Sequence, residues 1–347
     1  MIPEKVKKIL KKQHYEIVGK HSAVQTCRWT KRSLRNEGIC YKEQFYGIKS
    51  HLCCQMTPSV MWCPNQCLHC WRAVEHTIGD KLDKEKVDSA SEIIDGCIEA
   101  QRKLLQGFKI LPETADITFS KVDMKKWEEA QEPMQFAISL SGEPTIYPYV
   151  GELIEELKQR GKTSFLVTNG LYPEKLQELK DKNQLPTQLY LSVNAPNKKL
   201  YDEFHRSSKT DAWELLNKSL EVMSTLTPQG CTLKNIPKNI STKGNSRTVF
   251  RMNLVRDLNM GDELIKEYSE MIRKAKPMFV EIKGFMSVGF ARERLGYDRM
   301  PTNEEMENFI AKLVAELGEG YKLLDSHERS RAYVLGKDES QLKIEKP

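Results

Sequence analysis

Three cysteines lie within eight residues of this sequence, at Cys63, Cys67 and Cys70. Their spacing is Cys-x3-Cys-x2-Cys, and no fourth cysteine follows closely. A structural zinc site is closed by four ligands, and a [4Fe–4S] cluster usually takes four thiolates. Three thiolates leave one iron of such a cluster without a protein ligand, so that iron can bind a substrate and reduce it. The triplet therefore predicts an iron–sulfur centre with one open coordination position.

A second triplet, Cys27, Cys40 and Cys53, precedes the first with the spacing Cys-x12-Cys-x12-Cys. Cys54 competes with Cys53 for the third place, and the equal gaps favour Cys53. This set predicts a second cluster, which also has a vacancy. Zinc is the alternative metal for both triplets. At the first triplet, a neighbouring histidine or cysteine would complete a zinc knuckle. At the second triplet, zinc would hold an N-terminal extension in place.

The composition is that of a soluble protein with a sizeable core. The 347 residues are 39% hydrophobic and 29% charged, and the mean hydropathy is −0.56. No apolar run approaches the roughly 20 residues of a membrane span, and the N-terminus lacks the apolar core of a signal peptide. We therefore predict a cytoplasmic protein without a membrane partner, in which metal binding by reduced thiols outranks disulfides.

Positive charge is concentrated at the N-terminus. Residues 1–50 contain twelve lysines and arginines but only four acidic residues, whereas the whole chain has a net charge of +6. Such a local excess is able to bind phosphates through charge and counterion release. A solvated, lysine-rich helix face is the alternative interpretation.

Apolar periodicity predicts strands that alternate with helices. The expected strands are 48–56, 136–141, 164–168, 188–193, 248–254, 279–284 and 321–325. The expected helices are 3–18, 85–106, 148–160, 173–181, 211–225, 261–274 and 303–317. Residues 20–50, 107–130, 227–246 and 286–302 are expected to be irregular. This alternation indicates about six βα units and a parallel sheet.

Polar residues follow several of these strands. They include Ser141-Gly142-Glu143, Thr168-Asn169-Gly170, Ser192-Val193-Asn194 and Arg251-Met252-Asn253. Active sites of parallel α/β folds gather at the carboxyl ends of the strands, so these groups and the first cysteine triplet are expected to converge. Backbone groups at Gly142 together with Glu143 would suit an amino-acid ammonium group. A turn that leads into a helix at Pro144 is the alternative.

Two lysines are candidates for covalent chemistry. Lys42 lies two residues after Cys40, and Lys121 lies in an irregular stretch. A desolvated lysine has a lowered pKa and can form a Schiff base with a carbonyl substrate, although a solvated surface charge is the alternative for any single lysine.

Basic residues mix with aromatic ones in two places. One is the cysteine-bearing N-terminal segment, and the other is the loop with Arg292, Arg294, Tyr297 and Arg299. This mixture suits phosphate contacts and base stacking in RNA, and ordinary surface loops are the alternative.

Together these motifs resemble the radical S-adenosylmethionine enzymes. The Cys63–Cys70 triplet, Gly142-Glu143-Pro144-Thr145 and Asn169-Gly170 carry the resemblance. The upstream triplet, residues 41–48 and Ser192-Val193-Asn194-Ala195-Pro196 narrow it to the archaeal, single-domain 4-demethylwyosine synthases of the wybutosine tRNA pathway, over about residues 20–337. The flavodoxin-like domain of eukaryotic members is not expected here, so an external one-electron donor, a ferredoxin or flavodoxin-like protein, is implied.

The resemblance implies a fold and a set of cofactor ligands. The fold would be α/β, a partial (β/α)6 TIM barrel at 48–337, with a cysteine-bearing N-terminal extension at 1–47 and a tail at 338–347. Two [4Fe–4S] clusters would be held, one by Cys63, Cys67 and Cys70 and the other by Cys27, Cys40 and Cys53. S-adenosyl-L-methionine would bind the first cluster. The implied cofactor contacts are His69, Ser141, Gly142, Glu143, Asn169, Ser192 and Asn194.

The implied reaction joins two substrates on a tRNA. A radical would take hydrogen from the methyl group of N1-methylguanosine beside the anticodon of tRNA-Phe. The carbon radical would then add to pyruvate and form a C–C bond, with loss of the pyruvate carboxyl carbon, and ring closure would give tricyclic 4-demethylwyosine. Lys42 and Lys121 match the positions of the reactive lysines of the family. The alternatives are a radical enzyme acting on a peptide or small molecule, and a zinc-stabilised RNA-binding protein.

Overall fold

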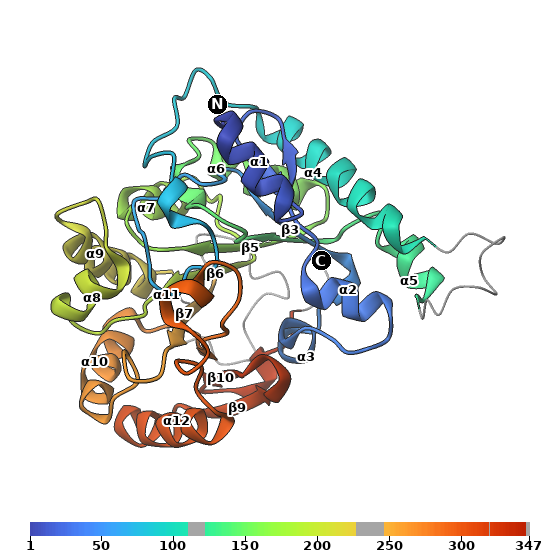
Figure 1. The fold of residues 1–347 in the computed structure, drawn as a ribbon. Coiled ribbons are helices and arrows are strands. Elements are labelled where there is room, and N and C mark those ends of the chain that lie inside the picture. Colours follow the sequence, from blue (N-terminus) through green and yellow to red (C-terminus); the bar gives the residue numbers. More distant parts are fainter. Residues whose placement is uncertain (110–121, 227–245, 319, 345–347) are drawn as a thin grey trace.

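The computed structural model describes residues 1–109, 122–226, 246–318 and 320–344 (Figure 1). Their strands form one sheet in the order β1-β2-β3-β4-β5-β6-β7-β8-β10-β9. The strands are β1 (Glu16–Val18), β2 (Ser22–Val24), β3 (Cys53–Thr57), β4 (Gln135–Ile138), β5 (Thr163–Thr168), β6 (Gln188–Ser192), β7 (Arg247–Leu254), β8 (Phe279–Gly284), β9 (Lys322–His327) and β10 (Ala332–Gly336).

The six strands from β3 to β8 pair in parallel, each with the next along the chain. Antiparallel pairs extend both edges, with the β1–β2 hairpin beside β3 and the β9–β10 hairpin beside β8. Because β1 and β9 stand at opposite ends of the strand order, the described sheet is a barrel that is not closed. The predicted α/β fold with six parallel units is confirmed.

Helices cover the outer face of this sheet. In Figure 1, α4, α6, α7, α9, α10 and α12 form an arc around it. The helices are α1 (Glu4–Lys12), α2 (Arg28–Leu34), α3 (Tyr41–Tyr46), α4 (Ala90–Leu105), α5 (Met124–Glu129), α6 (Val150–Gln159), α7 (Pro173–Asp181), α8 (Lys198–His205), α9 (Ala212–Ser224), α10 (Ile265–Ala275), α11 (Ala291–Leu295) and α12 (Asn303–Leu317).

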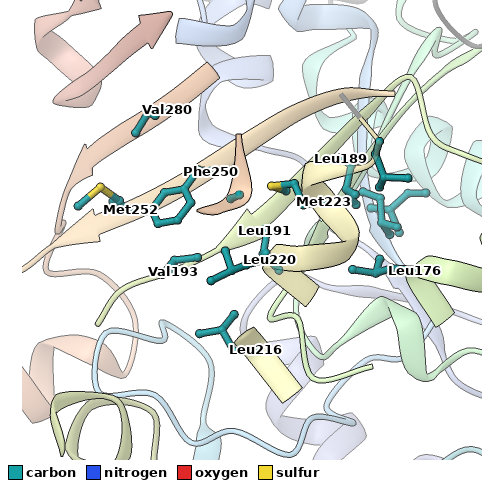
Figure 2. Close-up of a cluster of buried hydrophobic side chains, with 14 of the residues drawn as sticks. Leu176, Leu189, Leu191, Val193, Leu216, Leu220, Met223, Phe250, Met252 and Val280 are labelled. Atoms are coloured by element: carbon teal, nitrogen blue, oxygen red, sulfur yellow. The ribbon is translucent and has the colours of Figure 1, made fainter. Parts of the chain in front are cut away.

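Side chains of each parallel strand alternate between two cores, as the period of two in a strand requires. Leu189 and Leu191 of β6 belong to the larger, outer core, which the helices cover. Figure 2 shows part of this core between the sheet and α9. Tyr190, between them in the sequence, belongs to a smaller core on the inner face, together with Phe165 of β5 and Phe45 of α3. The N-terminal segment therefore supplies α3 to the inside of the barrel.

Several sequence predictions of local structure were wrong. The first helix ends at Lys12 rather than at residue 18, because the chain reverses at His14 (φ 61°) and residues 16–18 become β1. The strand expected to begin at residue 48 begins at Cys53, after a 3₁₀ turn at Ser50–Leu52. The N-terminal segment thus pairs and packs with distant parts of the chain, which local periodicity does not reveal.

Regular elements also occur in stretches that were expected to be irregular. Residues 20–50 contain β2, α2 and α3, residues 107–130 contain α5, and residues 286–302 contain α11. The helix α8 and the strand β10 were not predicted at all. Most of these elements are short, five to eight residues, and they depend on tertiary packing rather than on a long apolar stripe. The loop expected at 227–246 lies almost wholly outside the described residues.

Candidate active site

The first cysteine triplet lies on the loop that follows β3. Cys63, Cys67 and Cys70 are half-buried, and a backbone bond from Cys70 N to Cys67 O (3.1 Å) turns the loop. Burial raises the pKa of the Cys63 thiol to about 11, so the isolated thiol is protonated at neutral pH. A bound metal replaces such protons and holds the thiolate form.

A buried arginine stands beside all three thiols. Arg72 is 2% exposed, and its guanidinium donates to the carbonyl of Asn65 (2.6 Å) and to Thr77 Oγ1 (3.1 Å). Burial alone would lower the pKa of the guanidinium. The nearby Cys63, Cys70 and Cys67 have the larger combined effect as thiolates and raise this pKa. A fixed positive charge at this point fits a set of anionic thiolates. Sequence reasoning missed Arg72, although it lies only two residues after the last cysteine.

Gly142 brings the end of β4 against the segment that leads into this loop. Its φ is +87°, and a Cβ atom there would lie 1.9 Å from the carbonyl oxygen of Ser59. Only glycine fits a left-handed conformation with so close a neighbour. The next residue continues the contact, because Glu143 N donates to Trp62 O (2.7 Å) and Ser59 Oγ donates to Glu143 O (2.7 Å).

The carboxylate of Glu143 joins the ends of two strands. It accepts from Thr145 N (3.1 Å), Thr145 Oγ1 (2.6 Å), Thr168 Oγ1 (2.7 Å) and Asn169 N (2.7 Å). Burial raises the pKa of Glu143, while these bonds favour the ionised form. The ammonium contact predicted for Glu143 stays a prediction, and the observed role of its side chain is to tie β4 to β5.

Other predicted cofactor contacts lie at the same edge of the sheet. The amide Nδ2 of Asn169 is 3.7 Å from Cys63 Sγ, and Asn194 Oδ1 accepts from Asn253 N (2.9 Å). Ser192 ends β6. The buried hydroxyls of Ser141 and Tyr15 lie next to each other at this edge. These residues follow the carboxyl ends of β4, β5 and β6, and their contacts with a cofactor stay a prediction.

The ring of His69 is already stacked on a protein side chain, which leaves it less available to a cofactor base. Its ring packs on Phe204 of α8, with the ring centroids 4.9 Å apart and the planes 30° from parallel. The cofactor contact predicted for His69 therefore remains a prediction without support from its present neighbours.

The second cysteine triplet is brought together at the inner face of the barrel. Cys27 and Cys40 directly precede α2 and α3, and Cys53 is the first residue of β3. The pKa of both Cys40 and Cys53 is raised to about 12, mainly by burial and to a smaller extent by the nearby Cys27. Cys54 points to the opposite face, where its thiol is 3.9 Å from the carbonyl oxygen of Cys97 on α4. Strand alternation thus separates the two competing cysteines.

Within the described ranges, no three His, Cys, Asp or Glu side chains are placed to hold a single metal ion. A four-iron cube is larger than one ion and takes its three thiolates at different corners. The donor set of each triplet, three thiols without carboxylates, is the soft kind that iron–sulfur clusters use. The residues therefore fit the clusters that the sequence predicts, and the assignment of each cysteine remains a prediction.

Lys42 is buried at the inner face beside the second triplet. It is 7% exposed, and its ammonium nitrogen lies 4.5 Å and 4.8 Å from the ring centroids of Phe165 and Tyr190. Burial lowers the pKa of Lys42, and the nearby Glu281 partly opposes this. The second candidate lysine, Lys121, lies outside the described residues.

A charged group around Lys42 was missed by sequence reasoning. Glu281 is fully buried and accepts from Tyr46 Oη (3.1 Å), and Arg251 Nε lies 3.5 Å from its other oxygen. Lys283 Nζ lies 4.5 Å from the ring centroid of Tyr41, and burial lowers its pKa to about 8. A signal was available, because charges at alternate positions of the apolar strand Phe279–Gly284 indicate one polar inner face.

The basic loop at 286–302 is largely engaged with the protein itself. Arg294 donates to Leu68 O (3.2 Å), Arg72 O (3.3 Å) and Cys70 O, and it pairs with Glu75 (3.0 Å). Arg299 contacts the carbonyls of Arg256 and Asp257. These two arginines stabilise neighbouring loops, which weakens the predicted role of this loop in binding phosphate.

The apolar face of α1 packs against residues that flank the first cysteine loop. Val6 and Leu10 of this helix pack in one core with Trp62 and Ala73, which flank that loop. Tyr15 continues the contact by stacking on Trp71 with ring centroids 5.9 Å apart. Within the parts of the chain that the structure describes, none of the helices has the length and apolar character that a membrane span requires.

Comparison with known proteins agrees with this geometry. Residues 58–227 match the model of the radical SAM superfamily, and residues 274–337 match the model for wyosine base formation. The chain is 43% identical to the tRNA 4-demethylwyosine synthase of Pyrococcus abyssi, over 97% of this chain and 90% of that protein. It is 34% identical to the one from Methanocaldococcus jannaschii, over 96% of each.

Two solved structures resemble the whole fold. A structure of TYW1 with a lysine–pyruvate adduct bound has a TM-score of 0.79 and 32% identity, and a crystal structure of archaeal TYW1 has 0.71 and 30%. Each covers 99% of both chains. Identity above 40% along nearly the full length, together with both domain matches, leads to one conclusion: the chain belongs to the S-adenosyl-L-methionine-dependent tRNA 4-demethylwyosine synthases, a family of radical SAM enzymes that modify tRNA.

Proposed function

We propose that this enzyme condenses N1-methylguanosine, next to the anticodon of tRNA-Phe, with pyruvate to form 4-demethylwyosine. The observation that carries the proposal is the position of Lys42, an amine buried at the inner face of the barrel beside a second cysteine triplet. The similar structure of TYW1 with a lysine–pyruvate adduct bound supplies a precedent for a lysine in this role.

Cys63, Cys67 and Cys70 would hold the cluster to which S-adenosylmethionine binds. When bound, these two groups would supply a carbon radical that takes a hydrogen atom from the methyl group of the substrate base. Arg72 would balance the charge of the thiolates, and Gly142 and Glu143 would fix the loop against the ends of β4 and β5. The electron would come from an external donor of the ferredoxin or flavodoxin-like kind.

Cys27, Cys40 and Cys53 would hold a second [4Fe–4S] cluster near Lys42. Its open iron would supply Lewis-acid binding for pyruvate. Because Cys53 begins β3 and the first cysteine loop follows its end at Thr57, the two triplets are reached from opposite ends of this strand. The guanine base would have to leave its stack and enter between them.

Lys42 would attack the keto carbon of pyruvate as a neutral amine, which yields an imine and releases water. The rings of Phe165 and Tyr190 beside Lys42 keep the amine out of bulk water, and burial lowers its pKa toward the neutral form. Arg251 and Lys283 carry positive charge at the same face and suit a substrate with a carboxylate.

The direct test uses the reconstituted enzyme, methylated tRNA, pyruvate, S-adenosylmethionine and a strong reductant, with each omitted in turn. Mass spectrometry of the digested tRNA should find the tricyclic base only in the complete mixture. A radical enzyme for a peptide or small molecule would give no tricyclic base in any mixture, and that result would overturn the proposal.

The role of Lys42 needs its own variant. Lys42→Ala should still cleave S-adenosylmethionine but form at least about 100-fold less product, since it lacks the covalent site for pyruvate. Borohydride reduction with pyruvate should add mass to the Lys42 peptide of the native enzyme. Lys49→Ala is the matched control, because Lys49 is an exposed lysine paired with Glu129 (3.1 Å). Native turnover by Lys42→Ala would remove this lysine from the mechanism.

A further inference from the structure

The C-terminal end of α8 is bound directly to the first cysteine loop. Gln66 N donates to the carbonyl of His205 (2.9 Å), and Leu68 N donates to that of Phe204 (3.0 Å). Just past the helix, Ser208 N donates to the carbonyl of Pro64 (2.9 Å). Three backbone bonds therefore fix the loop between Cys63 and Cys70 to one short helix, independently of any side chain.

One side chain of this helix reaches a cysteine of the triplet. The Nδ1 atom of His205 lies 3.1 Å from Cys67 Sγ. The ring is 3% exposed and is packed against Tyr201, with centroids 4.4 Å apart, and against Phe204, with centroids 5.2 Å apart. Its other nitrogen, Nε2, is buried and has no partner among the described residues. Packing thus aims the ring at Cys67, and Nδ1 makes the single polar contact found for it.

The chemistry of the two groups fixes the direction of this bond. A cysteine that ligates iron is a thiolate, which can only accept a hydrogen bond. The imidazole must then donate from Nδ1, as a neutral ring protonated at that nitrogen. Hydrogen bonds to the sulfurs are among the factors that set the reduction potential of an iron–sulfur cluster. A donated bond draws negative charge from the sulfur, and this favours the reduced cluster, which carries one more electron.

We propose that His205 is a positioning residue of the first cluster, which donates an Nδ1–H···S bond to Cys67 and makes the cluster easier to reduce. The proposal rests on the assignment of Cys63, Cys67 and Cys70 as cluster ligands made above. It goes beyond that assignment, because it gives α8 and His205 an electronic role that backbone docking alone would not supply.

The test is a redox titration of the anaerobically reconstituted full-length enzyme, followed by electron paramagnetic resonance. If two clusters titrate, the relevant one is the cluster whose signal changes when S-adenosylmethionine is added. His205→Leu should lower the equilibrium constant for reduction about tenfold, which is a shift of 59 mV to more negative potential for one electron. His205→Gln keeps a side-chain N–H donor and should recover part of the shift.

A matched control separates this effect from general loosening of α8. Asn197 caps the other end of the helix by accepting from Leu200 N (3.0 Å). Asn197→Ala should lower thermal stability but leave the potential unchanged. If Asn197→Ala shifts the potential as far as His205→Leu does, the electronic role is wrong and α8 acts only as a support.

A second measurement needs no apolar variant. Enzyme with ¹⁵N-labelled histidine should show a nitrogen coupling on the reduced cluster, and this coupling should be lost in His205→Gln. A cluster that forms without such a coupling in the native enzyme would overturn the inference while leaving the proposed function intact. If the native enzyme takes up no cluster at this site, the assignment of the cysteines itself fails.

Discussion

Cys53 and Cys54 are adjacent in the sequence, yet the structure gives them different surroundings. Cys53 begins β3 on the inner face, where it is close to Cys27 and Cys40. Cys54 is fully buried in the outer core next to α4. The twelve-residue gaps favoured Cys53 on spacing alone, and strand alternation now supplies a physical reason for the same choice.

This difference predicts the iron content of two variants. The two-cluster assignment gives the native enzyme about eight irons and eight labile sulfides per chain. Cys53→Ala should retain about four irons, because one triplet is incomplete, whereas Cys54→Ala should retain about eight and lose only some stability. Iron and sulfide analysis after anaerobic reconstitution measures both. If Cys54→Ala lost iron while Cys53→Ala kept about eight irons, Cys54 rather than Cys53 would be the third ligand of the second cluster.

The short helices α8 and α11 contact the first cysteine loop, although both belong to later parts of the sequence. The two helices do not contribute ligands, but α8 binds the loop through its backbone and α11 presents Arg294 to three of its carbonyl groups. Buried carbonyls that lose a donor cost about 1–3 kcal/mol in stability. The loop is therefore held by elements that follow it by more than 100 residues.

Arg294→Leu should accordingly weaken retention of the first cluster. We expect iron to leave this variant several-fold faster than it leaves the native enzyme when a chelator is added anaerobically. Arg292→Leu is the control on the same helix, since Arg292 is exposed and stacks on Tyr297 with its guanidinium carbon 5.1 Å from the ring centroid. If Arg294→Leu holds its iron but loses tRNA affinity, its predicted role in phosphate binding would be restored.

Sequence periodicity was most successful where an element is long and amphipathic. The helices at 173–181 and 303–317 have the predicted bounds, and the parallel strands β4 to β8 fall where apolar runs predicted them. It failed for α3 and α8, which have only six and eight residues. Both helices matter for the site, because they carry Lys42 and His205 to places that only the folded chain defines.

The residues of the candidate site also divide into those that sequence motifs predicted and those that they did not. Spacing identified both cysteine triplets, and the rule for parallel sheets placed Ser141, Asn169 and Asn194 at one edge. Glu281 and Lys283 were not identified, because each acts through neighbours that are distant in sequence. Arg72 was missed although it lies only two residues after Cys70. Motifs thus reveal ligands that chemistry requires at fixed spacing, whereas charge-balancing residues depend on which strands become neighbours.

The distribution of charge relates the outer surface to the site. The cationic excess of the first 50 residues includes α1, whose apolar side packs beside the first cysteine loop and whose opposite side is exposed. A tRNA that presents its anticodon loop to the carboxyl ends of the strands would meet this helix. The exposed lysines of α1 are Lys5, Lys8, Lys11 and Lys12.

Replacing these four lysines by glutamine should make tRNA binding weaker and less dependent on salt. The slope of the logarithm of affinity against the logarithm of salt concentration changes by about 0.7–0.9 for each phosphate contact, so four lost contacts would flatten it by about 3. Filter binding or fluorescence anisotropy between low and moderate salt measures the slope. A control set with the same charge change lies on the outer helices at Lys218, Lys266 and Lys312 and just past the end of α10 at Lys276. Equal flattening by both sets would mean that tRNA binds through the overall charge of the enzyme, and an unchanged slope in the α1 variant would exclude this helix from the interface.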